Sequence, residues 1–162
     1  MAEKANFKTN ALRILEGLKI NYTLHKYDHE EGFVDGIGIA TKLGQDFNQV
    51  FKTIVTVGSS KANYVFVLPV DKEIDFKAAA RVVGEKSIEM IKVTDLTKIT
   101  GYIRGGCSPI GMKKKFRTVI DESCRTFETI MVSAGKVGYQ MELAPDDLIH
   151  AAETETADIC QK

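Results

Sequence analysis

The sequence predicts an α/β fold of the α+β kind: a mixed, barrel-like β-sheet surrounded by helices. Strand-like and helix-like segments alternate irregularly along the chain, which favours a mixed sheet over a wholly parallel one. The chain has 162 residues, enough to close one hydrophobic core without disulfides or metals. Its apolar fraction of 44% and charged fraction of 27% are typical of globular proteins. We therefore expect a single domain spanning residues 1–162.

Charge and cysteine usage exclude several classes of protein. The 22 basic and 22 acidic residues cancel, so any nucleic-acid partner would have to contact a local basic patch. No apolar run reaches transmembrane length, and the N-terminus lacks the pattern of a signal or transit peptide. We expect a cytoplasmic protein without membrane contact. The three cysteines and three histidines are widely scattered, which argues against a disulfide framework and a metal site, and we expect no cofactor.

Three elements are expected before residue 45. A helix over residues 11–18, with a cap at Thr9 or Asn10, places its apolar residues on one stripe. Residues 20–27 alternate like a strand. An acidic, glycine-rich loop then leads into a short helix over residues 35–43, closed by a glycine. This loop is either a mobile flap or a plain connector.

The middle and the end of the chain mix further strands and helices. Residues 52–68 read as a β-hairpin whose second strand has consecutive apolar residues, which predicts a central position in the sheet. Asp75 can cap a helix over residues 76–83. The remaining expected elements are a strand over 87–93, a helix over 94–99 capped by Thr94, a strand over 117–121, a polar crossover over 122–126, two strands within 127–143 joined at Gly135 to Gly138, and a helix beginning at Pro145.

The stretch RGGCSPIGMKKKF, residues 104–116, is the main candidate for function. Gly105 and Gly106 let the backbone approach a ligand closely, because glycine has no Cβ and tolerates positive φ. Pro109 fixes its own φ and pushes Ser108 towards an extended conformation, which stiffens the turn. A glycine turn beside a positive run suits an anionic ligand, and the run consists of Lys113, Lys114 and Lys115. By itself the stretch is equally compatible with a solvated surface turn.

Three separated pieces of sequence carry a more specific resemblance. They are Lys52 with Thr53, GYIRGGCSPIGMKKK (101–115) and SAGKVGYQMEL (133–143). Together they resemble the YbaK/EbsC family of free-standing aminoacyl-tRNA editing proteins, which is related to the insertion domain of prolyl-tRNA synthetases. The resemblance covers almost the entire chain. It implies a barrel-like mixed sheet with surrounding helices and the deacylation of mischarged Cys-tRNA for proline, without a covalent protein nucleophile or a metal.

The resemblance also implies the site. Lys52 matches the family's essential lysine, Gly105 the first glycine of GGxSPxG, and Ser133 the serine of SxGK. Backbone N–H groups at Gly105 and Gly106 would stabilise the negative charge that forms when an ester is cleaved. The residues expected to contact the substrate are Tyr27, Phe33, Thr53, Ser108, Ser133 and Gln140, and those expected to contact the tRNA backbone are Lys113, Lys114 and Lys115.

Several positions depart from the family pattern. Gln140 stands where some members carry aspartate, and Val137 replaces a common basic residue. An aromatic residue of some members aligns with Asp35, although the nearby Phe33 could serve after a small shift. These departures bear on amino-acid preference. Cys107 occupies a usually aliphatic position, so we interpret it as a packed apolar residue rather than a nucleophile.

The expected partner is therefore mischarged tRNA for proline, and we also consider a transient complex with prolyl-tRNA synthetase. A separate editing step is useful to the synthetase, because a hydrophobic pocket discriminates between similar-sized amino acids such as proline and cysteine by only about 10- to 200-fold. The substrate's own thiol would attack its ester, held in place by the protein. The rival hypothesis is a non-catalytic module that binds a nucleotide or the tRNA acceptor end through Lys113 to Lys115. A thiol enzyme using Cys107 is the third hypothesis.

Overall fold

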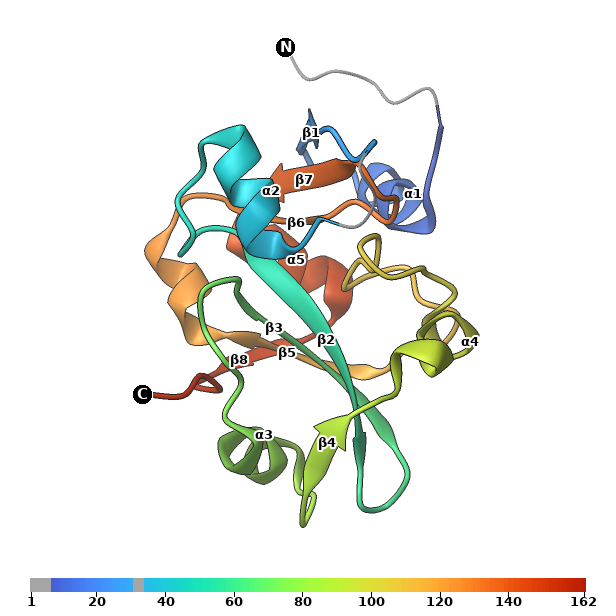
Figure 1. The fold of residues 1–162 in the computed structure, drawn as a ribbon, viewed down its shortest axis with the longest axis vertical. Helices are drawn as coiled ribbons and strands as arrows, with labels where there is room; N and C mark the ends of the chain where they lie inside the picture. Colours follow the sequence, from blue (N-terminus) through green and yellow to red (C-terminus); the bar gives the residue numbers. More distant parts are fainter. Residues whose placement is uncertain (1–6, 31–33) are drawn as a thin grey trace.

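Two β-sheets flanked by helices form the protein, as a computed structural model of the chain shows (Figure 1). The structure describes residues 7–30 and 34–162. Its elements in chain order are α1 (Asn10–Gly17), β1 (Thr23–Lys26), α2 (Gly36–Leu43), β2 (Phe51–Gly58), β3 (Asn63–Pro69), α3 (Phe76–Val83), β4 (Ile88–Met90), the 3₁₀ turn η1 (Val93–Asp95), α4 (Leu96–Thr100), β5 (Arg117–Asp121), the 3₁₀ turn η2 (Glu122–Thr126), β6 (Ile130–Ser133), β7 (Tyr139–Leu143), α5 (Pro145–Ala152) and β8 (Glu155–Ala157).

The larger sheet has the strand order β4-β2-β3-β5-β8, and the smaller one the order β1-β7-β6. Pairing is antiparallel except for β3 with β5 and β5 with β8, so the predicted mixed sheet is confirmed. As predicted, β3 is central. The barrel-like closure is not confirmed, because no sheet in the described part of the chain closes on itself. The two sheets meet through one parallel bridge, between Val50 and Met131, and then separate.

One edge of β2 is shared by two strands that leave it in different directions. Near its start, the Gln49 carbonyl accepts a hydrogen bond from the Met131 N–H at 3.0 Å. Towards its end, β4 pairs with residues 56–58, and the Ile91 N–H donates to the Val55 carbonyl at 3.3 Å. Between these two contacts the edge of β2 has no strand partner among the described residues. A cavity lies at this opening.

The helices begin where short polar side chains cap them. Thr9 caps α1 by accepting from the Leu12 N–H, and its hydroxyl also donates to the Ala134 carbonyl at 2.6 Å, which ties α1 to the turn after β6. Asp35 and Asp75 cap α2 and α3 in the same way. These three caps confirm the predicted helix starts.

Two short elements differ from expectation. Thr94 does not cap a helix but lies inside the 3₁₀ turn that precedes α4. The strand β8 was not predicted, since three residues carry too little periodicity to be recognised without their partner β5. In the described ranges, the structure has no helix with the length and apolar character needed to cross a bilayer.

Candidate functional site

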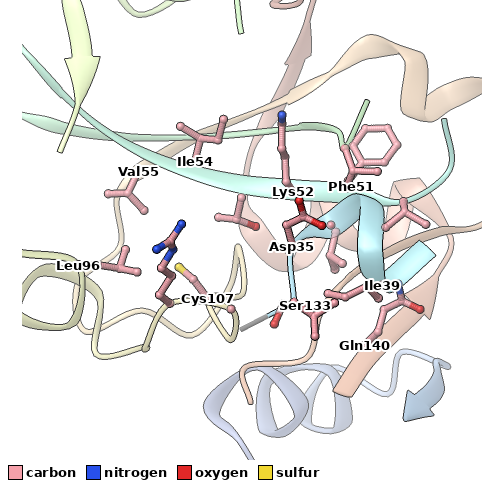
Figure 2. Close-up of a pocket in the computed structure, with 18 of the residues that line it drawn as sticks. Asp35, Ile39, Phe51, Lys52, Ile54, Val55, Leu96, Cys107, Ser133 and Gln140 are labelled. Carbon is pink, nitrogen blue, oxygen red and sulfur yellow. The ribbon is translucent and has the colours of Figure 1, made fainter. Parts of the chain in front are cut away.

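A cavity of about 370 Å³ opens beside the unpaired edge of β2 (Figure 2). Its volume lies in the range of small-molecule sites. Segments far apart in sequence line it: the end of β1, the start of α2, β2, the residue after β3, residues within 90–96, the 104–107 loop and the adjoining ends of β6 and β7. Its wall is mainly apolar and includes Ile39, Val50, Val55, Val70, Ile91 and Leu96.

The structure brings six of the predicted site residues to this cavity and leaves others outside. The six are Tyr27, Lys52, Thr53, Gly105, Ser133 and Gln140. Gly106, Ser108 and the three lysines do not line it. Phe33 lies outside the described residues.

Tyr27 and Gly105 meet across the cavity wall. The Tyr27 hydroxyl donates to the Gly105 carbonyl at 3.5 Å, and burial raises the pKa of the phenol. Gly105 has a φ of 87°, which explains the glycine, because other L-residues are strained there. Its N–H has no acceptor in the described part of the chain. That N–H is therefore available to a ligand.

Gly106 and Ser108 lie next to the cavity loop but do not line the cavity. The Gly106 N–H donates to the Ile103 carbonyl at 2.9 Å, so it is not free to stabilise an oxyanion. A Cβ at Gly106 would lie 3.0 Å from the Val137 nitrogen, so glycine permits close packing of the loop against the 136–138 turn. Ser108 is fully buried, does not line this cavity, and its Oγ has no hydrogen-bond partner among the described residues. In this structure the Gly106 N–H is used within its own loop and Ser108 lies outside the cavity lining, and their roles in catalysis and substrate binding stay predictions.

Lys52 lines the cavity, but its side chain points to the side of β2 opposite Ser133 and Cys107. Its neighbour Ile54 packs against a different core cluster from Val55, so alternate β2 side chains face opposite sides. Figure 2 shows Lys52 and Ile54 on one side of β2, and Ser133 and Cys107 on the other. No carboxylate of the described residues pairs with the Lys52 ammonium. Its flexible stem can therefore turn towards a bound anion at the edge of the cavity.

Ser133 and Gln140 lie directly opposite each other on β6 and β7. Gln140 is only 3% exposed, and its amide forms two hydrogen bonds with the amide of Gln45, just beyond α2. This pair holds α2, whose first turn lines the cavity, to the floor of the site. Gln45 was not predicted, because its partner is distant in sequence.

Cys107 lines the cavity, and burial raises the pKa of its thiol to about 12. The thiol is thus protonated near neutral pH, whereas the thiolate is the nucleophilic form. This agrees with the interpretation of Cys107 as a packed residue. In the ranges that the structure describes, no group of three or more His, Cys, Asp or Glu residues is arranged to hold a metal ion.

The lysine run lies on another part of the surface. Lys114 and Lys115 border a second cavity of about 480 Å³, together with the C-terminal ends of α1 and α5. Lys115 forms an ion pair with Glu153, and the Lys113 ammonium donates to the Lys98 carbonyl at 3.4 Å. The run therefore does not contribute to the first cavity.

Two charged residues of the first cavity were not predicted as site residues. Arg104 precedes the glycine pair, and Asp35 caps α2. The position of Arg104 directly before the glycine pair could have indicated that it lies at the site. Asp35 was predicted only as the start of the helix over residues 35–43, and this gave no indication of its place at the cavity.

Comparison with known proteins identifies the family. The profile of the aminoacyl-tRNA editing domain matches residues 38–151. The chain belongs to this family. It is also 41% identical over 160 residues, 99% of this chain and 98% of the relative, to a protein of Enterococcus faecalis named "Putative Cys-tRNA(Pro)/Cys-tRNA(Cys) deacylase EbsC". The predicted family and its class, aminoacyl-tRNA deacylases, are confirmed.

Solved structures of this editing fold superpose on almost the whole chain. One, described as "a putative trans-editing enzyme for prolyl tRNA synthetase", has a TM-score of 0.81 at 19% identity and covers 97% of this chain and 100% of its own. A hypothetical protein has a TM-score of 0.84 at 18% identity, covering 94% and 99%. At these identities the likeness establishes the fold.

Proposed function

We propose that the protein removes cysteine from mischarged tRNA for proline, acting as a free-standing editing domain over residues 1–162. Cys-tRNA for cysteine is a second candidate substrate. The proposal rests mainly on the cavity, where segments far apart in sequence bring together the residues expected from the family pattern. The E. faecalis relative's name supports the choice of cysteine.

In this proposal the aminoacyl-adenosine end of the tRNA occupies the cavity. The Gly105 N–H donates to the ester carbonyl oxygen, which becomes negative as the ester is attacked. Lys52 pairs with the terminal phosphate at the edge of the cavity, and Tyr27 holds the Gly105 carbonyl in place. Ser133 and Gln140 border the amino-acid side chain.

The substrate's thiol serves as the nucleophile. Its sulfur, after losing its proton, bonds to the ester carbon, the bond from that carbon to the ribose oxygen breaks, and the ribose oxygen takes up a proton. The resulting thiolactone is then hydrolysed by water. Holding the thiol close to the ester can supply about 7 to 11 kcal/mol of the barrier. The protonated Cys107 thiol makes a protein nucleophile at that position unfavourable.

We also propose that Lys113, Lys114 and Lys115 contact the tRNA backbone outside the cavity. The exposure of all three side chains supports this proposal. Such contacts would make binding weaken as the salt concentration rises.

A panel of mischarged tRNAs tests the proposal. We expect the purified protein to deacylate Cys-tRNA for proline faster than the same tRNA charged with alanine or proline. Binding of the tRNAs without turnover would contradict it and favour a binding module. The same assay with added prolyl-tRNA synthetase tests whether a transient complex selects the tRNA, which would appear as increased discrimination between tRNAs.

A further inference from the structure

The unpaired edge of β2 presents the peptide groups of Thr53 to the cavity. Peptide groups alternate between the two edges of a strand. The Val50 carbonyl accepts from the Val70 N–H and so points towards β3, whereas the carbonyls of Gln49 and Val55 point to the opposite edge. Thr53 shares the alternation of Gln49 and Val55. Its N–H and C=O therefore point together to the edge that borders the cavity.

The side chain of Thr53 adds a third polar group at this position. Its Oγ1 is buried and has no hydrogen-bond partner in the described part of the chain. Thr53 itself lines the cavity, where most of its neighbours are apolar. Buried N–H, C=O and hydroxyl groups are almost always hydrogen-bonded in folded proteins. A ligand with matching donors and acceptors would satisfy these groups.

An aminoacyl ester has such groups in a matching arrangement. Its α-ammonium donates and its carbonyl oxygen accepts, and in an extended conformation the two point the same way, as in a strand residue. In an antiparallel pair, two opposed residues exchange both N–H···O bonds. We propose that the aminoacyl group binds as a one-residue β-strand: its α-ammonium donates to the Thr53 C=O, and its carbonyl accepts from the Thr53 N–H.

This inference rests on the proposed function and adds how the amino acid is held. A carbonyl oxygen has two lone pairs, so it can accept from both the Thr53 and the Gly105 N–H. Opposed side chains of an antiparallel pair lie on the same face, about 4.5 to 5.5 Å apart at Cβ. The substrate side chain therefore lies beside Thr53 Oγ1, on the face that carries Val55. The backbone recognises the amino-acid framework, and the hydroxyl contacts its side chain.

Hydrogen exchange of the wild-type protein tests this pairing directly. The probe is 3′-deoxy-3′-(cysteinylamino)adenosine, a stable amide that keeps the α-ammonium and the carbonyl. We expect saturation with this probe to slow exchange of the Thr53 amide at least about 10-fold. The Ile54 amide is the internal control, because Ile54 lies opposite Phe66 in the β2–β3 ladder and its exchange should change little.

A matched ligand tests the α-ammonium. The 3-mercaptopropanoyl amide of the same nucleoside lacks only the α-amino group, and we expect its Kd to be at least about 10-fold higher. Unchanged exchange at Thr53 under saturation, equal affinity of the two ligands, or absence of binding would overturn the inference. Each of these results would leave the proposed function standing if Cys-tRNA is deacylated in parallel. Absence of deacylation for every charged tRNA would instead contradict the proposed function.

Discussion

The side-chain amides of Gln45 and Gln140 form a reciprocal pair, in which each Nε2 donates to the other's Oε1, at 2.8 and 3.0 Å. Gln45 follows α2 and Gln140 lies on β7, so the pair joins α2 to the smaller sheet. Because Gln140 is only 3% exposed, water does not readily replace a lost partner. The pair is expected to hold α2 in its place at the wall of the cavity.

Replacing one member should therefore cost more than replacing both. Gln45→Leu leaves the buried Gln140 amide unsatisfied, and we expect the free energy of unfolding to fall by about 1 to 3 kcal/mol. In Gln45→Leu/Gln140→Leu both polar groups are gone, and stability should recover towards the wild-type value. Urea denaturation of the three proteins measures this. A double variant less stable than the single one would contradict the expected coupling.

Lys52→Ala should impair deacylation without affecting folding. Lys52 makes no ion pair with the described residues, so its removal should change stability by no more than about 0.5 kcal/mol. Loss of its contact with the substrate phosphate should lower kcat/KM about 10- to 150-fold. Steady-state kinetics on Cys-tRNA, with thermal unfolding, measure both. Lys77→Ala, on the exposed face of α3, is the control. Equal rates for wild type and Lys52→Ala would remove Lys52 from the site.

Local sequence was sufficient for the starts of α1, α2 and α3 but not for the closure of the sheet. Thr9, Asp35 and Asp75 each accept a hydrogen bond from the N–H three positions further along, so the chain itself indicates where these helices start. Whether strands close into a barrel depends on pairing between distant segments. β6 leaves β2 after the bridge at Val50, and nothing near Val50 in sequence indicates this.

The same distinction applies to the cavity. The family resemblance predicted Tyr27, Lys52 and Gly105, and they line one cavity. The resemblance could not show which backbone N–H groups are free to bind a substrate, and the Gly106 N–H donates within its own loop. Gln45 escaped prediction because its partner is 95 residues away.

Cys107 should be dispensable for the reaction. Burial holds the pKa of its thiol at about 12, so very little thiolate exists at pH 7 to 8. Cys107→Ala is expected to keep most of its activity on Cys-tRNA and to lose about 1 kcal/mol of stability from reduced packing. In a Cys124→Ala/Cys160→Ala background, the remaining thiol should react slowly with iodoacetamide at pH 8. Abolished activity in Cys107→Ala would instead support a thiol enzyme.

Glu85 should make the β2–β3 hairpin sensitive to acid. Hydrogen bonds from Ser60 and Tyr64 lower the pKa of its carboxyl from 4.5 to about 2. A carboxyl with a lowered pKa in the folded state contributes stability above its unfolded pKa and loses it as the pH falls. The contribution should therefore be complete above about pH 4.5 and decline towards pH 2.

Tyr64→Phe tests this assignment, since the Tyr64 hydroxyl donates to Glu85 at 2.6 Å. NMR titration of the Glu85 carboxyl should show a higher pKa in the variant. In urea denaturation at pH 6 and pH 3, Glu85→Gln should show a smaller pH dependence than the wild type. An unchanged Glu85 pKa in Tyr64→Phe would mean that the phenol does not hold the carboxylate.

Gly105 offers a test that separates backbone conformation from side-chain size. At a φ of 87°, an L-alanine is strained by about 1 to 2 kcal/mol, and the loop is expected to relax by rotating the N–H away from the ester carbonyl. Complete loss of one such donor costs about 100- to 1,000-fold in rate, which sets the upper limit for Gly105→Ala. D-alanine, introduced at position 105 by semisynthesis, has the mirror-image preference and adopts positive φ without this strain. Single-turnover deacylation should therefore be slow with L-alanine and substantially restored with D-alanine. Equal loss with both would mean that the added methyl group, rather than the direction of the N–H, obstructs the substrate.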